Sequence, residues 1–100
     1  MPVIHIEYDK SVLLESDVQL LCKGAHEVTV QVTGVADVPV YANSSHATYA
    51  IAPIEIFIRL SDHKITDKIA LSNELKMAAI KWKADNNFSH NINMSLIPMD

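Results

Sequence analysis

The strict alternation of residues 54–60 constrains this chain more than any other feature, because a period of two is typical of a β-strand. Its two faces differ in chemistry: Ile54, Ile56, Ile58 and Leu60 lie on one, and Glu55, Phe57 and Arg59 lie on the other. The aliphatic face is expected to pack under helices, where it leaves water. The face with charges and an aromatic ring suits a pocket or a subunit interface.

Residues 3–8 and 92–99 are predicted to be further strands. In the first of them, Ile4, Ile6 and Tyr8 alternate with Val3, His5 and Glu7. A helix is expected from about residue 16 to residue 32, where apolar side chains have helical spacing. Ser11 or Ser16 can cap its start, and Gly34 is a natural end.

A second helix is expected to begin after Thr66 or Asp67, either of which is a good N-cap, and to run to about Asp85. Residues 35–53 are expected to form a loop with short strands near 38–41 and 46–51. The order is then β-α-β, an irregular insert, and β-α-β. We predict an α+β fold with one domain spanning residues 1–100, in which a four-stranded sheet has both helices on one face. Oligomerisation would cover the other face.

The composition argues against several classes of partner. The net charge is -4, and the seven lysines and one arginine are scattered, so nucleic acid is not expected as a partner. The longest uncharged run, Val38–Ile54, is interrupted by Pro39 and by polar residues, so no spanning helix and no membrane partner are expected. No signal peptide is visible, and Cys22 is the only cysteine. These features predict a cytoplasmic protein without disulfides.

Neither a cofactor nor a metal is predicted. Gly24 and Gly34 are the only glycines, which leaves no glycine-rich loop for a phosphate. The five histidines lack the close spacing of metal ligands.

Pro2 carries the most distinctive chemistry. Removal of Met1 would leave Pro2 with a free secondary amine on a rigid ring, at the start of a strand. Such an amine titrates at roughly 7.7–8, so it can exchange protons near neutral pH. Apolar neighbours would lower its pKa, because desolvation disfavours the protonated form. The alternative interpretation is structural: Pro2 merely starts a strand, where a missing N–H costs little. With Met1 retained, Pro2 is an amide and cannot act as a base.

These segments together resemble the tautomerase superfamily, and in particular the 5-carboxymethyl-2-hydroxymuconate isomerase family. The resemblance rests on the Met1-Pro2 start, the strand at 3–8, the helix exit Thr33-Gly34-Val35, and the strand at 54–60 followed by a turn and a long helix. It covers nearly the whole chain, although residues 37–52 match poorly. It implies βαβ repeats assembled as a homotrimer, with sites at the subunit borders.

The resemblance also implies an activity, namely cofactor-independent keto-enol or double-bond isomerisation of a small unsaturated carboxylic acid. Pro2 would be the catalytic base and Arg59 would bind a substrate carboxylate. Family members usually carry an arginine on the strand after the first helix, whereas residues 39–46 contain none. Lys64 or His46 could substitute for it, or the substrate could carry fewer charges.

Several alternatives stay open from the residues themselves. Arg59 could form a salt bridge with Glu7 or Glu55 instead of binding substrate. Glu7, Glu55 and Asp9 could act as general acids, and Tyr41 or Tyr49 could donate a proton to an enolate oxygen; for the three acids, solvated or interface charge is the simpler interpretation. A catalytically inactive, tautomerase-like oligomeric binding or structural protein is the alternative function, and a ferredoxin-like interaction domain would share the topology.

Overall fold

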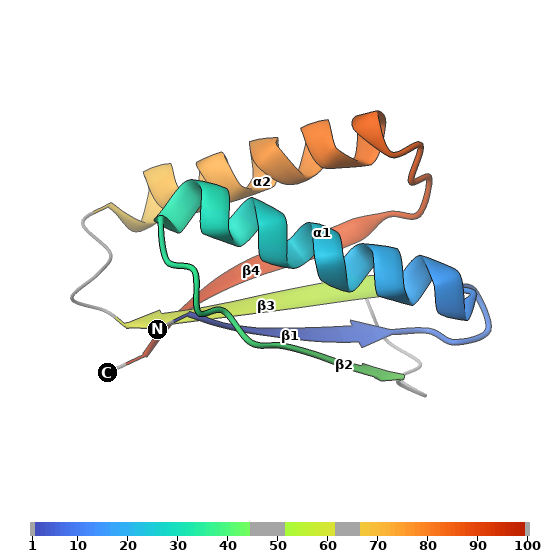
Figure 1. The fold of residues 1–100 in the computed structure, drawn as a ribbon. Coiled ribbons are helices and arrows are strands. Elements are labelled where there is room, and N and C mark those ends of the chain that lie inside the picture. Colours follow the sequence, from blue (N-terminus) through green and yellow to red (C-terminus); the bar gives the residue numbers. More distant parts are fainter. Residues whose placement is uncertain (1, 45–51, 62–66, 100) are drawn as a thin grey trace.

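The computed structural model describes residues 2–44, 52–61 and 67–99. Within them the elements are β1 (Val3–Tyr8), α1 (Glu15–Thr33), β2 (Val40–Ser44), β3 (Ile54–Ser61), α2 (Lys68–Asp85) and β4 (Ile92–Met99). Figure 1 shows both helices on one side of the sheet. The expected α+β fold, with a four-stranded sheet and two helices on one face, is therefore confirmed.

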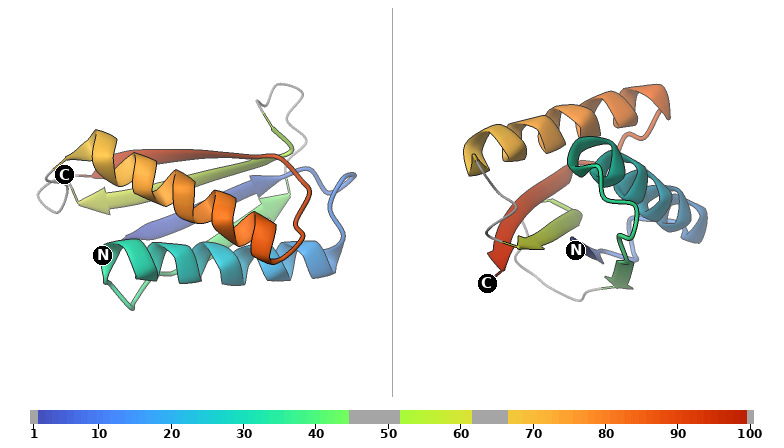
Figure 2. Two further views of the ribbon diagram at one scale, coloured as in Figure 1. Left: turned by 90° about the horizontal axis from the view of Figure 1, so that it is seen from above. Right: turned by 60° about the vertical axis from the view of Figure 1, so that its left-hand side comes forward.

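The strand order across the sheet is β2-β1-β3-β4. The outer strands run parallel to their neighbours, β2 beside β1 and β4 beside β3, and the two central strands β1 and β3 are antiparallel. Each parallel pair is joined by one helix, because a parallel partner requires a crossover. Two βαβ units thus meet side by side, as the view from above shows (Figure 2).

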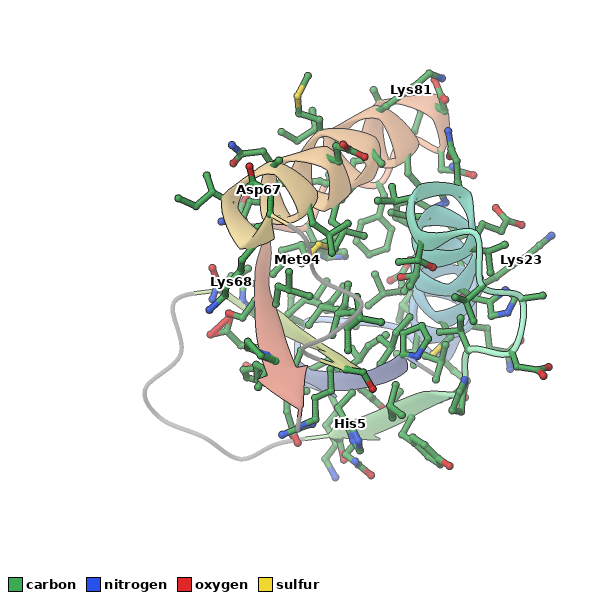
Figure 3. The ribbon with its side chains drawn as sticks, turned by 90° about the vertical axis from the view of Figure 1, so that its left-hand side faces the viewer. His5, Lys23, Asp67, Lys68, Lys81 and Met94 are labelled. Carbon is green, nitrogen blue, oxygen red and sulfur yellow. The ribbon has the colours of Figure 1, made fainter. Side chains whose placement is uncertain are left out.

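The core lies between the sheet and the helices. The central strands supply its most buried side chains, each at most 2% exposed: Ile4, Ile6, Ile54, Ile56 and Ile58. These residues occur at every second position of each strand, so the alternation in the sequence corresponds to the two faces of the sheet. In Figure 3, Met94 of β4 lies on the helix side of the sheet, whereas His5 of β1 lies on the opposite side.

The start of α1 differs from the prediction. Neither Ser11 nor Ser16 caps the helix, whose N-cap position is Leu14. Ser11 is engaged in the preceding turn, where its backbone N–H and its hydroxyl both donate to the Asp9 carboxylate, at 2.9 and 2.6 Å. The Leu14 N–H instead donates to Asp17 Oδ2 at 3.0 Å. The first turn thus bonds the N–H of the N-cap residue through Asp17, and the N-cap residue itself offers no side-chain acceptor.

The other helix ends agree with the sequence. Gly34 ends α1 with a left-handed φ of 75° and donates its N–H to the Val30 carbonyl. Asp67 caps α2 by accepting from the Ala70 N–H at 3.0 Å, while Thr66 lies outside the described residues. No helix within the described ranges is long and apolar enough to cross a membrane.

The segment after α1 forms one strand slightly later than expected. The predicted strand at 38–41 is found at Val40–Ser44. The Ile4 N–H donates to the Pro39 carbonyl at 3.0 Å, which fixes the register of β2 against β1. The second expected strand, at 46–51, lies outside the described residues.

Candidate functional site

Pro2 lies directly before β1, at the end of the sheet where β3 stops and α2 begins (Figure 1). Its side chain is less than 2% exposed. The segment that follows α1 lies beside the start of β1, because the N–H of Ile4, two residues after Pro2, donates to the Pro39 carbonyl. The predicted base is thus a buried proline at the start of the first strand.

Arg59 lies one residue away from Pro2 across the central strand pair. Its Cα partner is Val3, which follows Pro2 in the chain. Arg59 is half-buried on the face opposite the helices. Among the described residues it forms no ion pair with Glu7 or Glu55, the partners suggested by the salt-bridge alternative.

The open face, meaning the face of the sheet that the helices leave uncovered, is organised in three rows that run across the strands. The register gives the rows as Val3, Arg59 and Ile97; Tyr41, His5, Phe57 and Ser95; and Asn43, Glu7, Glu55 and Asn93. The first row is cationic, the second is aromatic and the third is acidic.

A depression of about 430 Å³ crosses these rows and is lined by His5, Glu7, Phe57, Arg59 and Ile97. Its volume is within the usual range of small-molecule sites. One guanidinium, two rings, one aliphatic side chain and one carboxylate thus share a single surface next to the start of the chain. Such a lining can bind a small planar acid.

The aromatic row is held in place by a ring contact. His5 of β1 stacks on Tyr41 of β2, with ring centroids 5.3 Å apart and planes 23° apart. Tyr41 is more than half exposed. Of the predicted proton donors, Tyr41 is therefore near the depression, while Tyr49, His46 and Lys64 lie outside the described residues. Asp9 is in the turn after β1, bonded to Ser11.

The acidic row brings two carboxylates into register. Glu7 and Glu55 are direct Cα partners on β1 and β3. Glu55 Oε2 is shielded from solvent and has no hydrogen-bond partner in the described structure. Like charges directly opposite each other destabilise a sheet. A hydrogen-bond donor from a bound molecule would reduce this repulsion between the two carboxylates. The alternation placed both residues on one face, but only the register reveals that they are adjacent.

The described residues contain no group of three or more His, Cys, Asp or Glu side chains that could hold a metal ion.

Comparison with known proteins gives a consistent fold. No protein-family model matches the sequence, and no curated protein matches it. Among solved structures, a fused wild-type 4-OT symmetric trimer matches with a TM-score of 0.71 and 14% identity, over 97% of this chain and 85% of that one. A 5-carboxymethyl-2-hydroxymuconate delta-isomerase matches with a TM-score of 0.60 and 16% identity, over 99% and 82%.

A third solved structure has the same architecture at lower sequence identity. Macrophage migration inhibitory factor from Giardia lamblia matches with a TM-score of 0.61 and 8% identity, over 95% of this chain and 96% of that one. The chain therefore shares the fold of these solved structures along nearly its whole length.

Proposed function

We propose that this protein is a cofactor-independent isomerase of the tautomerase type, and that the amino-terminal Pro2 is its general base once Met1 has been removed. The observation that carries this proposal is the position of Pro2: its ring is buried at the start of β1, one residue from a partly exposed arginine. The neutral amine accepts a proton from the enol or from the carbon beside the carbonyl. It then returns that proton to a different atom of the same conjugated system, a carbon or the carbonyl oxygen, so the reaction needs no redox partner.

Arg59 would anchor the substrate carboxylate. A guanidinium can donate two parallel hydrogen bonds to a carboxylate, and Arg59 is free of carboxylate partners among the described residues. Positive charge beside the reacting centre also stabilises the enolate that forms during proton transfer. The substrate class that follows is a small unsaturated carboxylic acid.

The active form is proposed to be a homotrimer in the cytoplasm. The half-buried apolar side chains of the open face, including Phe57 and Ile97, lie in the floor of the depression, and a neighbouring copy would form the roof above it. The similarity to a symmetric trimer of the same fold supports this assembly. A site at the subunit border would use the depression as its floor.

The test compares processed wild type with Pro2→Ala in a spectrophotometric ketonisation assay, after intact mass has established that Met1 is absent. Loss of the secondary amine is expected to lower kcat by about a hundredfold or more, the usual contribution of a positioned base. Pro98→Ala, an exposed proline on β4, is the matched control and is expected to keep wild-type kcat. Equal turnover by Pro2→Ala and wild type would overturn the proposed mechanism.

The absence of arginine in residues 39–46 favours one alternative, a catalytically inactive tautomerase-like oligomer that binds or supports another molecule. Processed wild type that fails to turn over enol acids of several shapes, while it still sediments as an oligomer, would favour this alternative.

A further inference from the structure

The depression on the open face has an ordered charge gradient. Arg59 lies at the end near Pro2, Phe57 and His5 lie in the middle, and Glu7 lies at the far end. Successive side chains on one face of a strand are roughly 7 Å apart. The cationic and acidic rows are thus separated by two such steps, or roughly 13 Å along the strand.

The middle of the depression is flat and apolar. Phe57 and Ile97 supply hydrophobic surface, and the His5 ring is held by its stack on Tyr41. A planar conjugated body can lie on such a surface with little loss of its own freedom. The orientation of a bound acid is then set by Arg59, which attracts its carboxylate.

At its far end the lining of the depression consists of Glu7, a carboxylate, and of no donor side chain among the described residues. Glu7 faces Glu55 across the strand pair, and Glu55 Oε2 is shielded and without a hydrogen-bond partner in the described structure. Glu7, which lines this end, can accept a hydrogen bond from a donor on a bound ligand. A second carboxylate at this end would instead meet two like charges.

We infer that the depression selects monocarboxylates whose distal end is neutral or carries a hydrogen-bond donor, and discriminates against dicarboxylates. This inference rests on the proposed function for its reaction, but not for the binding preference itself. Discrimination comes from the acidic row, so Glu7 is a specificity-determining residue and is not required for proton transfer.

The test uses phenylenolpyruvate and its derivatives that carry a hydroxyl, aminomethyl or carboxyl group in the para position. The para-carboxyl compound is expected to have a kcat/KM roughly tenfold lower than the parent, which corresponds to about 1.4 kcal/mol of repulsion. The hydroxyl and aminomethyl compounds are expected to equal or exceed the parent. Because substituents also alter enol reactivity, the dissociation constants of the matching unreactive 3-phenylpropionates are measured by calorimetry and should follow the same order.

Two isosteric variants locate the effect. Glu7→Gln and Glu55→Gln are expected to restore kcat/KM for the para-carboxyl compound to within about threefold of the parent value. Glu27→Gln, an exposed glutamate on α1 on the other side of the sheet, makes the same chemical change and is expected to leave the tenfold discrimination intact.

The outcomes separate the two proposals. Binding that ignores the para group, or discrimination that survives both Gln variants, overturns the inference about substrate class. Absence of turnover on every enol, with the binding order preserved, overturns the proposed isomerase function and supports the ligand class.

Discussion

Trp82 occupies the space in which a side chain at position 24 would begin. A Cβ added to Gly24 would stand 2.1 Å from Cε2 of the Trp82 indole. Gly24 belongs to α1 and Trp82 to α2, so the missing side chain allows the two helices to approach over the sheet. Phe88, which is buried, also packs against Trp82, with ring centroids 5.2 Å apart. The glycine is therefore required by packing between helices and not by its backbone angles.

Gly24→Ala is expected to lower the free energy of unfolding by about 1–3 kcal/mol, the usual cost of overpacking a core. This loss would appear although alanine favours a helix over glycine by about 1 kcal/mol. Urea unfolding followed by tryptophan fluorescence measures the difference directly.

The double variant Gly24→Ala with Trp82→Leu identifies the cause. A smaller side chain at position 82 relieves the clash, so the alanine should cost less in this background than in wild type. An alanine that costs the same in both backgrounds would show that Trp82 is not the obstacle.

Asp67→Ala is expected to destabilise the protein by about 0.5–2 kcal/mol, because the carboxylate accepts the Ala70 N–H at the first turn of α2. Asp67→Asn is the control, since an amide oxygen can accept the same bond. Thermal unfolding of both variants, followed by circular dichroism, should show a lowered Tm for the alanine and a nearly unchanged one for the asparagine. Equal losses in both variants would point to the charge of Asp67 and not to its cap.

Cys22 gives a prediction about pH. Burial, with a smaller contribution from the Glu15 charge, raises the pKa of this thiol above its ordinary value of 9.0. A pKa raised in the folded state means that the associated stability is fully present below pH 9.0 and is lost as pH rises through the folded pKa.

Alkylation of native protein at pH 8.5 should therefore be slower than alkylation of the urea-unfolded chain, because the thiolate is the reactive form. The loss of stability above pH 9.0 should be smaller in Cys22→Ser than in wild type. Native labelling as fast as that of the unfolded chain would contradict the prediction.

The sequence predicts the faces of the sheet well, because alternation depends only on local backbone geometry. It placed Ile56 and Ile58 on the face that packs under helices, where the structure has them, and Arg59 on the other face. On the first strand it separated Ile4 from Glu7. The sequence does not predict the register of β1 against β3. The pairing of Glu7 with Glu55, and of Val3 with Arg59, depends on that register. A shift by two residues would keep every face and abolish both pairs.

Helix starts show the same limit on a smaller scale. Ser11 and Asp67 are both good caps by residue type, yet only Asp67 caps a helix. The hydroxyl and the N–H of Ser11 both donate to the Asp9 carboxylate in the preceding turn, so the hydroxyl is not available to cap the helix. The antiparallel pairing of β1 and β3 brings Pro2 and Arg59 to the same end of the sheet. Local sequence patterns do not predict this pairing, and only the resemblance to a known fold suggested it.

Two isoleucines test the burial pattern on which the fold rests. Ile58 on β3 is 1% exposed, whereas Ile80 on the outer side of α2 is 67% exposed. Ile58→Val is expected to cost about 0.5–1.5 kcal/mol of unfolding free energy, since the removed methylene leaves a cavity. Ile80→Val removes the same group from a side chain that solvent already reaches, and is expected to stay within about 0.5 kcal/mol of wild type. Urea titrations at several protein concentrations check both values. A cost for Ile80→Val that matches Ile58→Val and grows with protein concentration would mean that the outer side of α2 is buried against another copy.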